Sequence, residues 1–194
     1  MWSKPGTQSD SNHKWLARQL LHLGCGAGAF FLKDFPMVLV ACGVVVGVLI
    51  IFAVILWRGG LGLLREGEGY VSGAVYYAIG LLIAMLLFSP EDVFVGWLIL
   101  SAGDSASTIV GRNWPLWRWP GARRSVGGSL GFFVASLAVL CVGLAWWHGT
   151  FGVVPYARII LVSAVCAAAE VWTPKIDDNL YLPVLAALVY ALSG

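Results

Sequence analysis

Two long stretches of the chain, Met37–Trp57 and Gly69–Pro90, contain no aspartate, glutamate, lysine or arginine. A helix needs about 20 consecutive apolar residues to cross the hydrocarbon core of a bilayer, and both stretches are long enough. Charged residues make up 11% of the 194-residue chain and hydrophobic residues 59%, whereas a soluble domain carries about 25% charged residues. The chain is therefore predicted to be an integral membrane protein built from helices.

Further apolar segments repeat this pattern along the chain. Residues 1–14 are expected to form a polar N-terminal tail, and residues 15–194 a single transmembrane domain. The fold is predicted to be all-α, a polytopic bundle of about six to seven transmembrane helices. The expected helices cover residues 15–32, 37–57, 70–88, 93–111, 127–147, 156–173 and 180–194. Residues 89–92 are expected to form a tight acidic turn between two of these helices.

Basic residues are distributed unevenly between the loops that this arrangement predicts. All of the twelve lysine and arginine residues except Lys33 and Arg158 fall on one side of the membrane. In membrane proteins the short cytoplasmic loops carry an excess of lysine and arginine. The N-terminus and the loop over residues 112–124 are therefore predicted to face the cytoplasm.

The expected helix over residues 93–111 carries an ionisable residue, Asp104. A charged side chain inside a membrane costs several kcal/mol, and such residues usually serve function. Three hydroxyl residues and one arginine share its helical face, at spacings of three and four residues: Ser101, Ser105, Thr108 and Arg112. Small and hydroxyl residues also mediate close helix contacts in lipid, which accounts for Ser101 but not for Asp104. Asp104 is therefore a candidate functional residue.

A loop rich in arginine and tryptophan follows this helix and leads into a Gly-Gly-Ser helix start. Unpaired N–H groups and the helix dipole at such a start favour phosphate, and arginines add bidentate contacts to phosphate oxygens. The loop arginines could instead fix topology, with the tryptophans as interface anchors, and Arg118 between Trp117 and Trp119 suits that role. The lysine that ends a Walker loop is absent. The predicted phosphate-binding residues are Arg112, Arg123, Arg124, Ser125, Gly128 and Ser129.

A third polar element lies near the C-terminus, where Glu170 is followed by Asp177-Asp178-Asn179. Asp178 or Asn179 could serve only to cap the next helix. Carboxylates from two helices, together with nucleotide phosphates, are also the ligands that Mg²⁺ prefers. The predicted metal ligands are Asp104, Glu170, Asp177 and Asp178.

The first helix adds two weaker candidates, Arg18 and His22, which lie four residues apart on one helical face. A lone histidine near an interface is more often a hydrogen-bonding residue than a catalyst. The nearby Gly24, Gly26 and Gly28 are predicted to serve helix packing, because no strand precedes them to make a dinucleotide motif.

In their order along the chain, these elements resemble the CTP-dependent lipid-alcohol kinases, which include dolichol kinase, phytol kinase and the yeast-type diacylglycerol kinase. The resemblance covers most of the chain from Arg18 onward. It rests on four groups of residues: Arg18, Gln19 and His22; Gly103-Asp104, Ala106 and Gly111-Arg112; the run from Arg123 to Ser129; and Glu170 with Asp177-Asp178-Asn179 and Pro183. The chain departs from the family pattern at Gly127, where glutamate is usual, and at Gln19, where lysine is frequent.

The resemblance implies phosphoryl transfer from CTP, with Mg²⁺, to the hydroxyl of a long-chain lipid alcohol such as a polyprenol, phytol or diacylglycerol. It makes residues 15–194 the catalytic domain of a compact prokaryotic member, in the inner membrane with its site facing the cytoplasm. Asp104 and Asp178 become the expected catalytic residues, with Asp178 preferred as the proton acceptor. Asn179 joins the nucleotide-binding residues, and Arg18 and His22 are placed at the lipid interface. The expected partners are a membrane lipid and a nucleoside triphosphate, with a homo-oligomer possible and no nucleic acid.

Two other functions fit parts of the pattern. A cytidylyltransferase would use the same nucleotide and metal to make a CDP-lipid, but the Lys-Asp and His-Gly-Gly patterns of phosphatidate cytidylyltransferases are missing. A transporter would spread its acids through the depth of the membrane and break helices in paired positions. The acids of this chain are instead expected to gather at one face, which favours the kinase.

Overall fold

The computed structural model describes residues 19–57, 72–122, 124–172 and 177–194. Within these ranges the chain is helical and forms no strand, apart from one isolated bridge between Arg118 and Ser125. The predicted all-α class is confirmed. The helical elements after residues 19–26 are η1 (Ala27–Phe30), α2 (Phe31–Asp34), α3 (Met37–Trp57), α4 (Ser72–Leu87), α5 (Pro90–Leu98), η2 (Ile99–Gly103), α6 (Asp104–Asn113), α7 (Val126–His148), η3 (Phe151–Val153), α8 (Tyr156–Trp172) and α9 (Asp178–Leu192).

The expected acidic turn over residues 89–92 is wrong, because Ser89 caps α5 and residues 90–92 form its first turn. The Ser89 side chain accepts from the backbone N–H of Asp92, and the Asp92 carboxylate accepts from the backbone N–H of Ser89 at 3.1 Å. This is a reciprocal capping box. Pro90 occupies the first helical position, where its missing N–H costs nothing.

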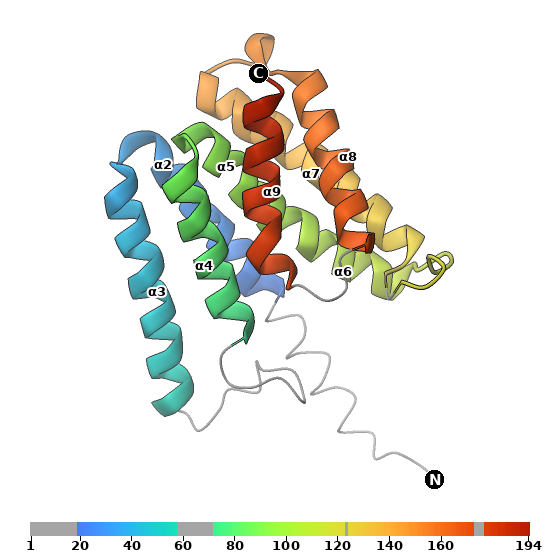
Figure 1. Cartoon of the computed structure of the whole chain (residues 1–194), viewed down its shortest axis with the longest axis horizontal. Helices are drawn as coiled ribbons and strands as arrows, with labels where there is room; N and C mark the ends of the chain where they lie inside the picture. The colour runs from blue at the N-terminus through green and yellow to red at the C-terminus, as the bar shows by residue number, and fades with distance from the viewer. Residues whose placement is uncertain (1–18, 58–71, 123, 173–176) are drawn as a thin grey trace.

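Helix α9 lies between α4 and α8 and also contacts α5 (Figure 1). Glycines on two neighbours let it approach closely, because a Cβ added to Gly80 would lie 2.5 Å from the Asn179 carbonyl oxygen and one added to Gly96 would overlap the Pro183 carbonyl. Pro183 inside α9 has no N–H to donate to the carbonyl of Asn179. The start of α9 is thereby fixed against α4, which places Asp178 and Asn179 in the bundle.

The N-terminal helical segment packs against α5 and η2 through two glycines. A Cβ on Gly26 would overlap the Ser101 hydroxyl, and one on Gly28 would lie 2.7 Å from the Trp97 indole. The packing role predicted for these two glycines is confirmed. Gly24 differs, because a Cβ there would meet nothing within 4 Å.

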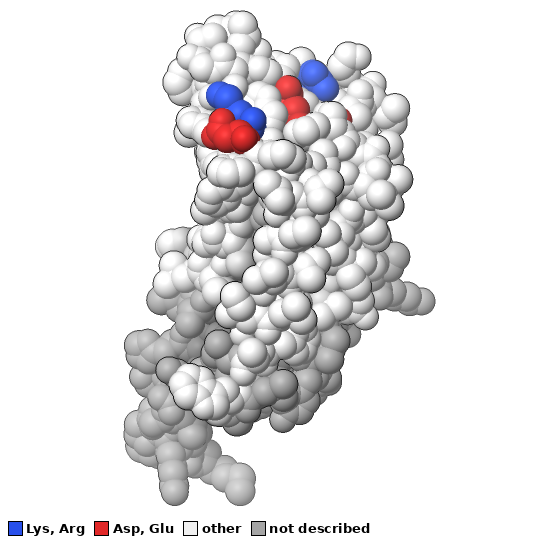
Figure 2. Space-filling view, turned by 90° about the vertical axis from the view of Figure 1, so that its left-hand side faces the viewer, with Lys and Arg blue, Asp and Glu red and all other residues white. Residues whose placement is uncertain are grey.

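The outer surface exposes large apolar side chains, among them Val38, Leu49 and Trp57 of α3. On the face that Figure 2 shows, the charged side chains gather near one end and the rest of the described surface is uncharged. Two helices, Pro90–Asn113 and Val126–His148, are long and apolar enough to cross a membrane, and the other apolar helices of the described ranges are shorter. The count of six to seven spans stays a prediction.

Candidate active site

Three carboxylates from distant parts of the chain meet at one end of the bundle. Asp104 begins α6, Glu170 lies in the last turn of α8, and Asp178 begins α9. One carboxylate oxygen from each residue lies within 4.8 Å of the other two. Glu170 is the most buried, at 4% exposed. Three of the four predicted metal ligands thus come together, and these three residues are called the acidic cluster below.

The guanidinium of Arg124 sits among these acids. Its Nη1 lies 3.2 Å from Glu170 Oε1, and its Nη2 lies 3.7 Å from Asp104 Oδ1 and also pairs with Asp178 Oδ2. Burial lowers the pKa of Arg124, but the carboxylates of Glu170, Asp178 and Asp104 raise it by more, so the pKa lies above its ordinary value. The arginine-rich loop between α6 and α7, here called the basic loop, therefore forms one site with the helices that carry the three acids.

Glu170 has a second partner that the sequence reasoning did not single out. The Ser107 hydroxyl donates to Glu170 Oε1 at 2.7 Å. The other oxygen, Glu170 Oε2, is buried and has no hydrogen-bond partner among the described residues. Ser107 could have been found from its spacing, because it lies three residues after Asp104 and so shares one side of α6.

This donor set fits a divalent cation of the Mg²⁺ type. Such cations take carboxylate oxygens as ligands, and three carboxylates in reach of one another carry more negative charge than one arginine balances. The buried, unpartnered Glu170 Oε2 offers a further acceptor. Asp104, Glu170 and Asp178 are therefore the residues of this end of the bundle that could hold the ion.

A π-helical turn, η2, immediately precedes Asp104. His22 Nε2 lies 3.0 Å from the Leu100 carbonyl oxygen within this turn and 3.7 Å from Asp104 Oδ2. Since a carbonyl oxygen only accepts, Nε2 carries the hydrogen in this pair. Single π turns are frequent at functional sites. The helix expected over residues 93–111 is confirmed, and the π turn lies within it. Through His22, this turn connects the N-terminal segment to the acidic cluster.

The basic loop folds back over the start of α7. The Val126 N–H donates to the Trp117 carbonyl at 2.8 Å and the Gly127 N–H to the Pro115 carbonyl at 3.1 Å. The next two amides, of Gly128 and Ser129, donate to the Ser125 hydroxyl and carbonyl. The prediction that this helix start offers unpaired amides to phosphate is therefore wrong for this conformation. A phosphate contact at the start of α7 would therefore have to come from the side chain of Ser125 or Ser129.

The same folded-back loop accounts for the departure from the family pattern at Gly127. A Cβ added to Gly127 would overlap the Trp114 carbonyl oxygen, so this loop conformation leaves no space for a side chain there. The glutamate that is usual in the family could not be accommodated without moving the loop.

Gly127→Ala should consequently destabilise the protein. The Trp114 carbonyl would have to shift and the Gly127–Pro115 hydrogen bond would be strained, at a cost of about 1–3 kcal/mol. The measurement is the thermal unfolding midpoint in detergent. Gly152→Ala is the matched control, because its Cβ would lie 3.7 Å from Thr150 Oγ1, an ordinary contact. Equal midpoints for the two variants would show that the loop does not pack as described.

A small polar cavity of about 200 Å³ lies beside the acidic cluster. Residues of α6, the basic loop and the start of α7 line it: Ser107, Thr108, Gly111, Pro115, Arg118, Arg124, Ser125 and Gly128. Three predicted phosphate-binding residues are thus brought together here. Arg118 also lines the cavity, although its position between tryptophans suggested an interfacial anchor.

The other predicted site residues lie elsewhere. Asp177 is outside the acidic cluster and caps α9, since its carboxylate accepts from the Asn179 N–H at 3.0 Å; the cap suggested at Asp178 or Asn179 is therefore one residue earlier. Arg112 is exposed at the end of α6. Arg18 and Arg123 lie outside the described residues.

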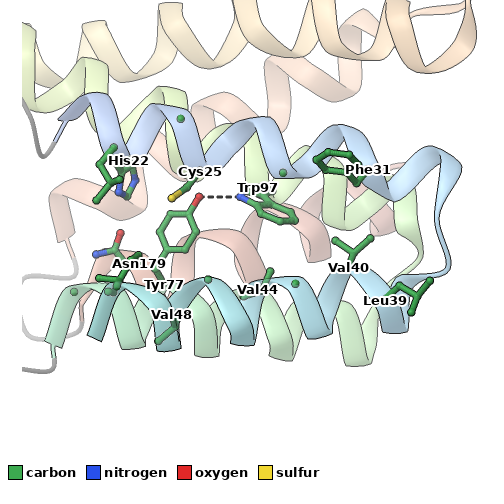
Figure 3. A pocket seen from close by; sticks show the side chains of 18 of the residues that line it. His22, Cys25, Phe31, Leu39, Val40, Val44, Val48, Tyr77, Trp97 and Asn179 are labelled. Carbon is green, nitrogen blue, oxygen red and sulfur yellow. Dashed lines mark hydrogen bonds between the residues drawn. The ribbon is translucent and has the colours of Figure 1, made fainter. Parts of the chain in front are cut away.

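An apolar groove of about 670 Å³ runs from the acidic end along the N-terminal segment and α3 (Figure 3). His22 and Asn179 lie at one end of it, and Phe31, Leu39 and Val40 lie at the other. Asn179, expected at the nucleotide, therefore lies where the groove meets the cluster. Sequence reasoning did not locate this groove.

The fold and site together define an all-α, apolar protein with a carboxylate–arginine centre at the end of a hydrophobic groove. The chain is 32% identical over 144 residues to CTP-dependent diacylglycerol kinase 1 of Schizosaccharomyces pombe, covering 67% of this chain and 64% of that protein. It is 31% identical over 123 residues to phytol kinase of Synechocystis, covering 60% and 52%. It is 34% identical over 132 residues to an uncharacterised protein of Methanocaldococcus jannaschii, covering 66% and 63%.

The chain is therefore a relative of the CTP-dependent lipid kinases, and the resemblance predicted from its motifs is confirmed. It spans less than two thirds of the length of each of these relatives. No family model matches the chain, and no solved structure does.

Proposed function

We propose that this protein is a CTP-dependent kinase that phosphorylates the hydroxyl of a long-chain lipid alcohol at the cytoplasmic face of a prokaryotic inner membrane. One observation carries the proposal: the apolar groove ends at the acidic cluster. His22 lines the groove and lies 3.7 Å from Asp104, and Asn179 lines the groove beside Asp178. A hydrocarbon chain in the groove would bring its hydroxyl to the carboxylates. The names of the relatives support the same reaction.

The geometry supports a role for each residue of the site. Asp104, Glu170 and Asp178 would hold Mg²⁺, which when bound neutralises charge on phosphate oxygens. Arg124 and Arg118 would bind the phosphates of the nucleotide from the polar cavity that both line. Asp178 would take the proton of the acceptor hydroxyl, because it precedes the residue that lines the groove. Phosphoryl transfer needs this positioning and charge balance more than covalent catalysis.

The direct test uses purified protein in proteoliposomes with Mg²⁺ and CTP labelled at either the γ- or the α-phosphate. The acceptors are a polyprenol, phytol and dioleoylglycerol. We expect the γ-label to enter a lipid monophosphate with release of CDP. Transfer of the α-label, with release of pyrophosphate, would identify a cytidylyltransferase instead. Transfer of neither label to any acceptor would overturn the proposal.

Sidedness gives a second test, because nucleoside triphosphates are available in the cytoplasm. Asn113 is exposed at the end of α6, beside the basic loop. Asn113→Cys, in a background without the four native cysteines, should resist an impermeant thiol reagent in intact cells and react after the membrane is opened. CTP with Mg²⁺ should slow that reaction.

The matched control is Gly152→Cys in the exposed η3 connection, which the predicted topology places outside. It should react in intact cells. Reaction of the Asn113→Cys variant from outside would invert the topology and separate the site from its phosphate donor. If CTP with Mg²⁺ did not slow the labelling of the Asn113→Cys variant, the basic loop would not cover the bound nucleotide.

A further inference from the structure

The apolar groove has the length of one membrane leaflet. Helix α3 lines it over residues 39–51, about 18 Å of helix at 1.5 Å per residue. Half of the hydrocarbon core of a bilayer is about 15 Å thick. The groove is therefore long enough for a hydrocarbon chain lying along the bundle with its polar end at the acidic cluster.

Glycines hold this groove open. Gly43 and Gly47 lie four residues apart, on one face of α3, and Gly24 lines the groove from the N-terminal segment. A Cβ added to any of the three would meet nothing within 4 Å. These glycines do not bring helices into contact, as Gly26 and Gly28 do. Because they have no side chains, the groove is wider at these three positions.

One buried polar atom at the end of the groove has no hydrogen-bond partner in the described part of the chain. Asn179 is 6% exposed, and its Oδ1 accepts no hydrogen bond from the described residues. A buried acceptor without a donor is costly, and the hydroxyl of an alcohol is a donor of the right kind. The Asn179 side chain points toward His22 at the groove end in Figure 3.

The walls beyond this end offer almost no polar partners. The Tyr77 hydroxyl accepts from Trp97 Nε1 at 2.8 Å and keeps a single O–H to donate, so it could serve only one of two ester carbonyls. The rest of the described lining toward Phe31 and Leu39 is aliphatic, aromatic or glycine, with the thiol of Cys25. A glycerol backbone would bring two ester groups against these walls, and burying a polar group without a hydrogen bond is unfavourable.

We infer that the groove binds an alcohol with a single, ester-free hydrocarbon chain, whose hydroxyl donates to Asn179 Oδ1 in the absence of nucleotide and whose chain passes Gly47 and Gly43. The acceptor class is thus a prenol rather than a diacylglycerol. The inference rests on the proposed kinase function for the fate of the hydroxyl, and it assigns Gly43 and Gly47 as the residues that determine which chain fits.

The test follows binding without catalysis. The probe is geranylgeraniol carrying a photoreactive diazirine at the end of its chain, incubated with the full-length protein in detergent without nucleotide. We expect cross-links in the peptides that contain Phe31, Phe35 and Leu39. Unlabelled geranylgeraniol should compete, its methyl ether about fivefold less well because it has no hydrogen to donate, and dioleoylglycerol at least about tenfold less well.

Gly47→Leu should lower labelling at least about tenfold. The leucine side chain would occupy the space of the hydrocarbon chain of the probe, and the free energy from burying the methylenes of the probe would be lost. The variant should fold well, since leucine favours a helix more than glycine does. Val46→Leu is the matched control, because Val46 is exposed and does not line the groove. It should label like the wild type.

Equal competition by dioleoylglycerol, or undiminished labelling of Gly47→Leu, would overturn the inference. Phosphoryl transfer from CTP without cross-links in the groove would also overturn it and leave the kinase proposal standing. Groove cross-links without transfer to any alcohol would leave the groove assignment standing and overturn the kinase proposal.

Discussion

Asp104→Asn should abolish phosphoryl transfer and leave the protein folded. Asparagine keeps the shape of the side chain but removes the charge that a divalent cation requires. Asp104 also lies near Arg124 and His22, so its negative charge acts on the residues of the basic loop and of the groove end as well. We expect turnover to fall by a factor on the order of 10³ or more. A loss of this size is known for other phosphoryl-transfer enzymes when a positive charge that stabilises the transferred group is removed.

The measurement is the rate of γ-label transfer from CTP at saturating acceptor, with the unfolding midpoint recorded in parallel. Asp92→Asn is the matched control, because Asp92 takes part in the capping box at the other end of the same helical stretch. It should cost a little stability and retain turnover. Near-normal turnover of Asp104→Asn at ordinary Mg²⁺ would show that Asp104 is not a metal ligand.

Most helices could be predicted because the chain marks them with uncharged runs and polar breaks. The run Met37–Trp57 has the same bounds in sequence and structure. The π turn at Ile99–Gly103 could not be predicted, because no local residue pattern specifies it. Its backbone contacts a residue 78 positions away, where His22 meets the Leu100 carbonyl. Such a contact depends on the tertiary fold.

Residues of the candidate site could be named from the sequence, but their arrangement could not. Asp104 and Glu170 stood out because acids in apolar helices are costly. Asp178 stood out because it belongs to the Asp177-Asp178-Asn179 run at a helix start, where a carboxylate could bind Mg²⁺. That Arg124 lies among all three depends on how α6, α8 and α9 meet. The amides at the start of α7 were expected to be unpaired because a helix start normally leaves them so. The preceding loop supplies the carbonyls of Trp117 and Pro115, which the pattern of residues does not reveal.

The groove was beyond prediction for a related reason. A glycine in an apolar helix indicates either close packing or empty space, and the sequence does not distinguish the two. Gly28 and Gly47 illustrate the difference, since one lies against Trp97 and the other faces the groove. Only the positions of neighbouring helices decide which of the two applies.

Arg124→Gln should have opposite effects on the two ligands of the proposed site. Nucleotide binding should weaken by about tenfold or more, because an arginine contact to phosphate is lost. Binding of Mn²⁺ in the absence of nucleotide should strengthen, because Arg124 pairs with all three acids and so competes with a cation for them. Removing it leaves those carboxylates without that counter-charge, and each then favours a metal ion more strongly.

Mn²⁺ binding can be followed by electron paramagnetic resonance and by the unfolding midpoint. In chelator the variant should unfold at a lower temperature than the wild type, since removing Arg124 leaves the buried Glu170 carboxylate without its counter-charge. Saturating Mn²⁺ should restore the midpoint, and by more than it raises that of the wild type. Arg118→Gln is the control, because Arg118 lines the same polar cavity, and the arginine that pairs with the three acids among the described residues is Arg124. It should weaken nucleotide binding without strengthening Mn²⁺ binding. If Arg124→Gln bound Mn²⁺ less tightly than the wild type, the three carboxylates would not be the cation site, and Arg124 would serve only to hold α6, α8 and α9 together.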